Sequence, residues 1–492
     1  MINTPEIKMG VVGVSRDCFP AELTKKRLAN VAEECKKLNL NFYTAETIVE
    51  NEADAMKAVA EMKAAGVNAL TIYLGNFGPE GPLTICAKKL GVPYMLVAAA
   101  EESKNTLMVD GRGDAFCGML NASLNAGLRG MKPFIPAKPV GLPYEVAKNI
   151  EYFVSVARVV VGLKNLKVFS FGPRPHDFYA CNAPIVPLYN LGVEVMENSE
   201  LDLFELYEKA GSRTSDIAAK VKDMEKELAG ACGFPGKLPQ IAQFELTLEK
   251  FFEDNLGASE YGVFANKCWP AFQTTFHFVP CYVNSRLTGR GIPVACEVDI
   301  YGAVSEYMAQ LASNNPVTLL DINNTVPADL ETPVMPGVAN EDLFMGFHCG
   351  NTACQCLSSG FAMKYQLIMH RLLEPDKEPD VSCGTIEGTL KAGETTMFRL
   401  QHRPDGQLQS YIAEGSVLDV DPCTFGGTGV IAIPDFARFY RHVLLEKQYP
   451  HHGAFAFHHC GKALYDATTM LGVSDIATPQ PISVPYPTEN PF

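Results

Sequence analysis

Acidic residues stand where the sequence predicts the ends of buried strands. The apolar run GIPVA is followed by Cys296, Glu297 and Asp299, and the run PVTLL ends at Asp321. In open α/β sheets the carboxyl ends of the strands meet at one edge, where ligands gather. The residues between Glu297 and Asp321 leave room for one helix and a return strand. We therefore expect both side chains to emerge at one sheet edge, on neighbouring strands.

Two carboxylates held close together suggest a bound cation. Such a pair is costly unless a cation or a shared proton neutralises it. Oxygen ligands with one imidazole favour Mg²⁺ or Mn²⁺ over zinc, which prefers nitrogen and sulfur. The alternative is that Glu297 and Asp321 only cap the helices that follow them.

Histidines are available to complete such a site. The chain has ten, among them His348 in GFHCGNTA and the pair His451 and His452 in YPHHGAFAFHHCG. We expect His452, directly before Gly453, to reach a metal from a loop. The alternative is that these histidines are ordinary core or surface residues.

The elements that must position these residues alternate between strands and helices. Short β-branched runs separated by amphipathic helices predict βαβ units on parallel sheets, first over residues 1–163 and again over 164–324. From residue 325 to 492, short strands and turn signals such as KAGE and RPDG replace the long helices. The predicted fold is α/β, with two Rossmann-like domains in series followed by a β-rich, barrel-like C-terminal domain.

Composition excludes several classes of partner. The net charge is −15 and no run of Lys and Arg occurs, so nucleic acid is not an expected partner. No stretch is apolar enough to cross a bilayer, and the first residues lack a signal-peptide pattern. The 15 cysteines are scattered, and the C-x4-C-x-C spacing around Cys354 is not that of a zinc pair. We expect a cytoplasmic protein with reduced thiols.

The strings ACEVDIYGAVSEYMAQL, PVTLLDINN and HHGAFAFHH resemble the L-fucose isomerase family and its L-arabinose isomerase relatives. The resemblance implies two α/β domains before a β-rich domain, and a homo-oligomer whose active sites are shared between subunits. It implies that Glu297 is both a metal ligand and the catalytic group that moves a proton. Asp321 is then the second carboxylate ligand, with a catalytic role in moving the hydroxyl proton, and His452 is the imidazole ligand.

Further residues are expected to contact substrate. His348 resembles a histidine ligand of the arabinose branch that the fucose branch lacks, so it is expected to contact the metal or the sugar. Arg16 in VSRDCFP resembles a substrate-contacting arginine donated by the adjacent subunit, and Phe77 in LGNFGPEG belongs to a loop that resembles a sugar-contacting one. Lys267 and Trp269 in NKCWP follow a predicted strand and are expected to line the pocket. The alternative for Trp269 is a packing role.

The implied function is a metal-dependent aldose–ketose isomerase acting on a small sugar through a cis-enediolate. The metal would be Mn²⁺, or another divalent ion such as Mg²⁺ or Co²⁺, which stabilises the negative charge on the enediolate oxygens. Three alternatives stay open: the same chemistry on an anionic hexose such as a sulfonated one, a non-catalytic sugar-binding protein, and an epimerase. An anionic hexose needs a cationic pocket, for which the candidates are Arg16, Arg174, His176, Lys267, Arg286 and Arg290.

Overall fold

A computed structural model describes residues 3–108 and 110–490. The chain forms two compact units. The smaller one contains Pro5–Val161 with Asp466–Gly472, and the larger one is built mainly from Gly162–Tyr465. Residues 164–324 and most of residues 325–490 pack into this one larger unit, so the division into three domains stays a prediction.

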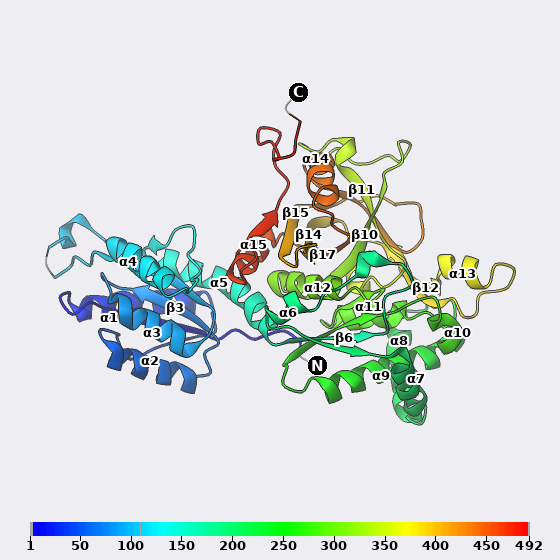
Figure 1. The fold of residues 1–492 in the computed structure, drawn as a ribbon, viewed down its shortest axis with the longest axis horizontal. Helices are drawn as coiled ribbons and strands as arrows, with labels where there is room; N and C mark the ends of the chain where they lie inside the picture. The colour runs from blue at the N-terminus through cyan, green and yellow to red at the C-terminus, as the bar shows by residue number, and fades with distance from the viewer. Residues whose placement is uncertain (1–2, 109, 491–492) are drawn as a thin grey trace. The chain divides into compact units, whose positions relative to one another are not determined.

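The smaller unit contains a parallel five-stranded sheet in the order β2-β1-β3-β4-β5 (Figure 1, blue to cyan). Its core strands β1, β3 and β4 are buried along their whole length, as their apolar runs predict. The strand order changes direction between β1 and β3, and ligands of parallel sheets bind at the carboxyl end of such a point. The strands are β1 (Met9–Val14), β2 (Phe42–Thr44), β3 (Ala69–Leu74), β4 (Tyr94–Ala99) and β5 (Val140–Gly141). The helices are α1 (Ala21–Lys37), α2 (Glu52–Ala64), α3 (Glu80–Leu90), α4 (Ala115–Leu128) and α5 (Pro143–Lys164).

The larger unit contains a second parallel sheet, in the order β7-β6-β8-β9. Two parallel sheets with intervening helices agree with the predicted α/β pattern, whereas the Rossmann-like description stays a prediction. The strands are β6 (Leu166–Phe171), β7 (Glu194–Asn198), β8 (Tyr261–Asn266) and β9 (Val294–Cys296). The helices are α6 (Val186–Tyr189), α7 (Glu200–Ala210), α8 (Thr214–Leu228), α9 (Leu238–Asn255), α10 (Phe272–Phe276), α11 (Cys281–Gly289) and α12 (Ile300–Ser313).

The same unit contains a nine-stranded mixed sheet, in the order β12-β13-β16-β11-β10-β17-β14-β15-β18. Strands β15 and β16 also pair, which closes a circuit of pairings through β16, β11, β10, β17, β14 and β15. The barrel-like description stays a prediction. The strands are β10 (Val317–Thr325), β11 (Leu343–His348), β12 (Ala362–Tyr365), β13 (Cys383–Thr389), β14 (Gly393–His402), β15 (Leu408–Val417), β16 (Gly427–Ala432), β17 (His452–Ala456) and β18 (Asp475–Ala477). The helices are α13 (Leu367–Leu373), α14 (Phe436–Phe439) and the first part of α15 (Gly461–Met470), whose residues from Asp466 on belong to the smaller unit.

One sequence-based expectation is wrong. Strand β10, which carries Asp321, does not neighbour β9 in the parallel sheet but pairs with β11 and β17 in the mixed sheet. An apolar run such as PVTLL is typical of any strand buried on both faces, so the sequence does not reveal which sheet it joins. Glu297 and Asp321 therefore come from two different sheets.

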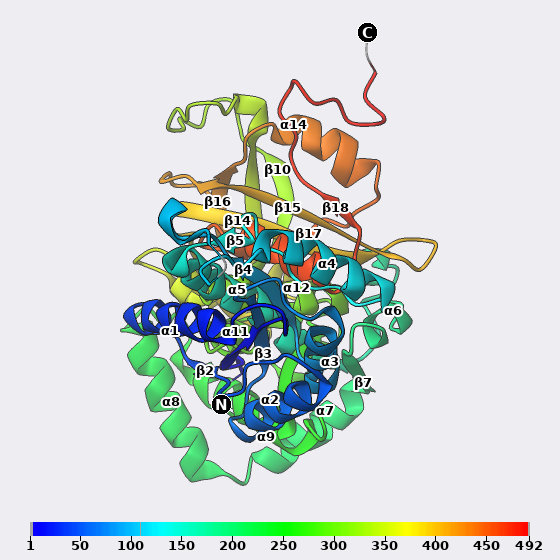
Figure 2. The same cartoon turned by 90° about the vertical axis from the view of Figure 1, so that its left-hand side faces the viewer.

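Helix α12 lies between these two sheets and is buried along its whole length. It contacts β6, β8 and β9 on one side and β10, β14 and β17 on the other (Figures 1 and 2). A helix covered on every side needs small and apolar residues all round, and IYGAVSEYMAQLAS meets this requirement almost throughout. It begins at Ile300, three residues after Glu297, so the packing of α12 helps to fix the position of that residue.

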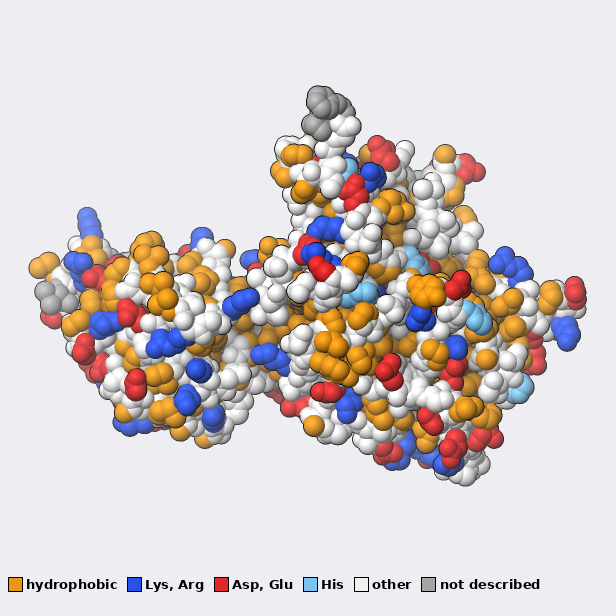
Figure 3. All heavy atoms as spheres, in the orientation of Figure 1, with side chains coloured by type: hydrophobic (Ala, Val, Ile, Leu, Met, Phe, Trp, Pro, Cys, Tyr) orange, Lys and Arg blue, Asp and Glu red, His pale blue; other side chains and the backbone are white. Residues whose placement is uncertain are grey.

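The C-terminal segment after β18 runs alongside α14 (Figure 2). The Arg438 guanidinium of α14 forms an ion pair with Glu489 at 2.6 Å and donates to the Gln480 carbonyl. Elsewhere on the face in Figure 3, basic and acidic side chains are interspersed. Among the described helices, none combines the length and the apolar character that crossing a membrane requires.

Candidate metal centre

Three neighbouring strands of the mixed sheet bring the predicted imidazole and carboxylate groups together. In the register of this sheet Asp321 of β10 is paired with His452 of β17 on one side and with Phe347 of β11 on the other. His348, the last residue of β11, follows Phe347 directly. His452 is the first residue of β17 and not the last residue of a loop, as the HHG sequence had indicated. Strand pairing therefore fixes the positions of all three side chains.

Glu297 reaches the same place from the parallel sheet. It follows β9 in a tight turn in which Glu297 and Val298 have φ values of 55° and 60°. The left-handed region is unfavourable for non-glycine residues, particularly for a β-branched one such as Val298. Such backbone strain concentrates at functional sites, where the surrounding structure maintains it. Here α12 and β9, both buried, hold the two ends of the turn.

The imidazole of His452 lies between the two predicted carboxylates. Its Nε2 is 3.4 Å from Glu297 Oε2 and 3.3 Å from Asp321 Oδ1. His348 joins Glu297 and His452 in one group, and His451 joins Asp321 and His452 in another. Within each group the possible ligand atoms lie within 4.8 Å of one another. Two carboxylates and at least one imidazole thus converge, as predicted for a divalent cation.

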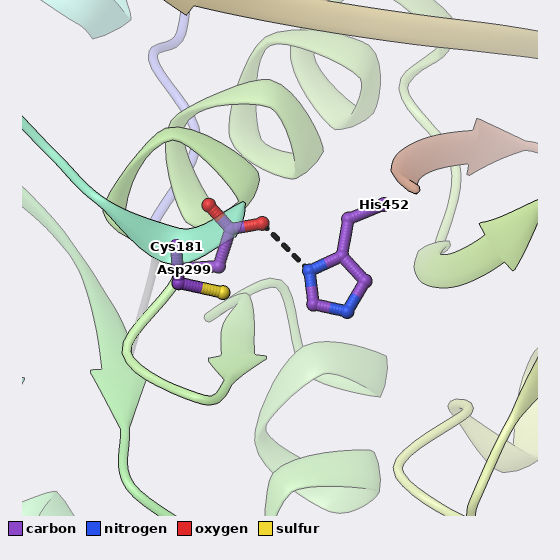
Figure 4. Close-up of side chains that lie close together, drawn as sticks. All are labelled: Cys181, Asp299 and His452. Carbon is purple, nitrogen blue, oxygen red and sulfur yellow. Dashed lines mark hydrogen bonds and ion pairs between the residues drawn. The ribbon is translucent and has the colours of Figure 1, made fainter. Parts of the chain in front are cut away.

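The other nitrogen of His452 is held by a buried carboxylate (Figure 4). Nδ1–H donates to Asp299 Oδ2 at 2.8 Å, and Cys181 lies beside this pair. Asp299 also receives two hydrogen bonds from Arg399, of 2.6 and 2.9 Å, and one from the backbone N–H of Gly302. Gln401 in turn accepts from Arg399. A carboxylate that fixes Nδ1–H leaves the Nε2 lone pair free to bind a metal, and it orients the ring.

The charges of the centre are strongly coupled. Burial alone would lower the pKa of His452, but its bonds to Asp299 and Asp321 outweigh burial and raise that pKa well above its ordinary value. Burial opposes ionisation of Asp299 and Asp321, yet Arg399 and His452 lower the pKa of Asp299, and His452 lowers that of Asp321. The ionised carboxylates therefore favour a positive charge between them. That charge can be a proton on His452, or it can be a divalent cation bound by the same groups.

A cavity of about 420 Å³ opens onto these groups. Glu297, Asp321, His348 and His451 contribute to its wall, and most of the remaining wall is apolar. Its other lining residues are Phe178, Cys268, Trp269, Gln273, Val279, Cys281, Phe347, Cys349, Gln366, Ile368, Met369, Arg371 and Leu372. A volume of this size suits a small molecule.

The remaining predicted residues divide into two groups. Trp269 lines the cavity, whereas Lys267 is not among the lining residues and pairs with Glu200 at 3.0 Å. Arg16 and Phe77 lie in the smaller unit, at the carboxyl ends of β1 and β3. There the Arg16 guanidinium lies 4.9 Å from the centre of the Phe77 ring. The structure therefore brings Trp269 to the metal-binding groups and places Arg16 and Phe77 side by side within the smaller unit.

Most of the predicted cations for an anionic substrate have other partners. Arg286 and Arg290 form ion pairs with the buried Glu245 at 2.6 and 2.7 Å, so their role is structural. The Arg174 guanidinium stacks on Tyr179, and His176 contacts Trp269 edge-on. The cation that does line the cavity, Arg371, was not predicted. It occurs in MHRLLEP with no local signal.

Two other residues of the site were missed or misread. Asp299 was predicted only as a strand-end acid, although an Asp directly before the helical stretch IYGAVSEYMAQ is a signal of a helix N-cap, and its side chain accepts from the Gly302 N–H. Arg399 lies between Phe398 and Leu400 in the strand TTMFRLQH, where alternation predicts an exposed side chain, but the structure buries it completely. A buried arginine requires an anionic partner, and that partner, Asp299, lies 100 residues away in the sequence.

Two family models match the chain. Fucose/sulfoquinovose isomerase, N-terminal domain, matches residues 10–164, and L-fucose isomerase, C-terminal domain, matches residues 346–477. His348 and His452 lie within the second match, and Glu297 and Asp321 lie between the two.

The chain is also similar to curated relatives named sulfoquinovose isomerase. That of Clostridium sp. (strain MSTE9) is 28% identical over 300 residues, or 60% of this chain and 61% of the relative. That of Priestia aryabhattai is 28% identical over 281 residues, or 56% of each chain. This chain thus spans between 56% and 61% of the length of these relatives. From both domain matches and these relatives, the chain belongs to the fucose isomerase family.

Proposed function

We propose that the protein is a metal-dependent aldose–ketose isomerase. The observation that carries this proposal is the convergence of Glu297 Oε2, Asp321 Oδ1 and His452 Nε2, with Nε2 within 3.4 Å of both oxygens. Membership of the fucose isomerase family supports the same reaction class.

The residues present fit a divalent cation. Glu297 Oε2 is buried and has no hydrogen-bond partner among the described residues, which is costly for a carboxylate unless a cation binds it. The donor set is two oxygens and one nitrogen, which suits Mn²⁺ best among the common ions, with Mg²⁺ or Co²⁺ as substitutes. Glu297, Asp321 and His452 would hold the ion, and His348 lies close enough to contact the ion or the sugar. When bound, the ion stabilises negative charge on neighbouring sugar oxygens.

The chain's own groups would move the protons. An aldose in its open form becomes a ketose when a proton leaves C2, returns at C1, and a hydroxyl proton moves to O1. We assign the carbon-bound proton to the Glu297 carboxylate, which lines the cavity and stays within reach of both carbons. Asp321 would carry the hydroxyl proton. His452, oriented by Asp299, would keep the Glu297 and Asp321 carboxylates at fixed distances from its ring. The apolar wall of the cavity would exclude water.

We propose a hexose with a sulfonate group as the substrate. Sulfoquinovose is such a sugar, and the relatives in Clostridium and Priestia are named for acting on it. A homo-oligomer, a cytoplasmic location and a contact of Arg16 and Phe77 with the sugar of an adjacent subunit stay predictions from the family resemblance.

The test is incubation of the purified chain with Mn²⁺ and a panel of sulfonated and neutral aldoses, followed by NMR of the products. We expect ketose from a sulfonated hexose. Glu297→Gln should keep the fold and lose more than about 99% of the activity, because loss of a general base costs about 10²- to 10⁴-fold. Glu205→Gln on the exposed face of α7 is the matched control and should keep full activity.

The other products of this test contradict the proposal in different ways. A new aldose would indicate an epimerase, and binding of sugar without any product would indicate a sugar-binding protein. A Glu297→Gln variant that keeps most of its turnover would remove Glu297 from the proposed role.

A further inference from the structure

A single arginine side chain lines the candidate cavity, and it has no hydrogen-bond or ion-pair partner in the part of the chain that the structure describes. Arg371 is the only lysine or arginine of its wall among the described residues. Its guanidinium makes no hydrogen bond or ion pair with any residue in ranges 3–108 and 110–490, whereas Arg286, Arg290 and Arg399 all pair with carboxylates. Arginine carries five N–H donors and is always charged, and because Arg371 is exposed, these donors are open to water or to an anionic ligand.

The segment that carries Arg371 is anchored at both ends. At the start of α13, the Gln366 side chain accepts a 2.6 Å hydrogen bond from the backbone of Met369. At the end, the buried Glu374 carboxylate accepts from the backbone N–H groups of Asp380, Val381 and Ser382. The guanidinium therefore starts from a fixed helix beside the cavity, which reduces the entropy lost when a ligand binds.

The charges of the wall make an unpaired arginine informative. Glu297 and Asp321 line the same cavity and would hold the divalent cation, so among the described residues Arg371 is the one Lys or Arg of the wall left for a second anionic group. Ile368, Met369 and Leu372 of the same helix line the cavity as well, so Arg371 adds a charged group to a largely apolar part of the wall.

We propose that Arg371 binds the anionic group of the substrate and thereby determines specificity for a sulfonated over a neutral hexose. This inference rests on the proposed function. The planar fork of a guanidinium can donate two parallel hydrogen bonds to two oxygens of a sulfonate. A neutral sugar has a hydroxymethyl or methyl group at the same carbon, and neither group carries a negative charge or two acceptor oxygens.

The experiment compares binding of two probes to the Mn²⁺-loaded protein by calorimetry, namely 6-deoxy-6-sulfoglucose and 6-deoxyglucose. Arg371→Met should weaken binding of the sulfonated sugar about 10- to 100-fold and leave the neutral sugar unchanged, since a charged hydrogen bond contributes about that factor. Arg371→Lys should recover part of the loss. Lys377→Met, an exposed cation of the same segment that does not line the cavity, is the matched control and should change neither affinity.

Salt dependence separates this role from a structural one. Added NaCl should weaken binding of the sulfonated sugar to the wild-type protein more than to Arg371→Met, because salt screens an exposed charge pair. If Arg371 only stabilises the last turn of α13, the variant will unfold at a lower temperature without any change in the ratio of the two affinities. An unchanged ratio in the folded variant overturns the proposal.

Failure of this inference is distinguishable from failure of the proposed function. Arg371-dependent binding of the sulfonated sugar without formation of ketose would retain the role of Arg371 and reject the isomerase. Formation of ketose from neutral aldoses, with no preference for the sulfonate in either variant, would retain the isomerase and reject the role of Arg371.

Discussion

Replacing Asp299 with Asn tests the buried network that orients the proposed metal ligand. The substitution keeps the size of the side chain but removes its charge from between Arg399 and His452. Arg399 is fully buried and would lose its only ion-pair partner among the described residues. Removing one partner of a buried ion pair costs about 3–5 kcal/mol. The metal-free variant should therefore unfold at a clearly lower urea concentration than the wild type.

The same substitution should weaken metal binding for a separate reason. Without the carboxylate, nothing enforces the tautomer of His452 whose Nε2 lone pair faces Glu297 and Asp321. Loss of such a supporting group weakens metal affinity about 10- to 100-fold. The assay is titration with Mn²⁺, followed through the electron paramagnetic resonance signal of the free ion, at a temperature where the variant is folded.

Two further variants separate the effects. Asp299→Asn combined with Arg399→Met removes the unpaired cation and should recover much of the stability while metal binding stays weak. Asp342→Asn is the matched control, because Asp342 is another buried carboxylate that accepts backbone hydrogen bonds, from Ala339 and Ala437. It should lose about 1–3 kcal/mol of stability with unchanged Mn²⁺ affinity. A folded Asp299→Asn protein with wild-type Mn²⁺ affinity would refute the role of the network.

Two other predictions concern stability. Burial raises the pKa of Glu306 to about 8, so between its unfolded value near 4.5 and pH 8 the folded state binds the extra proton, and the stability of the metal-free protein should fall across this window. His452, whose pKa is also raised, adds to the fall only above its ordinary value of 6.5, so Glu306→Gln should flatten the fall below pH 6.5 in urea titrations at several pH values. An unchanged slope below pH 6.5 in Glu306→Gln would assign it to another group. Saturating Mn²⁺ should stabilise the larger unit by about 3 kcal/mol at 100 times its Kd, measured as a chelator-reversible rise in unfolding temperature. No such rise, or the same rise in Asp321→Asn, would contradict the proposed ligands.

Much of the fold could be predicted from local patterns. Apolar runs such as KMGVVGV and LKVFSFG form buried parallel strands, and the Pro- and Gly-rich region forms the strands β13 to β16 where alternation and turn residues predict them. What could not be predicted is the partner of each strand, because pairing depends on contacts distant in sequence. Strand β10 shows this, since its residues fit a parallel sheet equally well but pair with β11 and β17.

The site shows the same division. Glu297, Asp321, His348 and His452 were predicted from residue types at strand ends and from a family resemblance, and they converge. The groups that support or complement them were harder to find, because their signals are incomplete. The residues around Arg399 in the sequence do not identify Asp299 as its partner. Arg371 is informative because it lines the cavity and has no partner among the described residues. Neither fact can be read from a single sequence.

The most direct test of the account is anomalous diffraction from a crystal of this protein soaked with Mn²⁺. The account predicts one strong peak about 2.0–2.3 Å from Glu297, Asp321 and His452, as expected for Mn²⁺ with oxygen and nitrogen ligands. A peak coordinated by other residues, or none at saturating Mn²⁺, would contradict it.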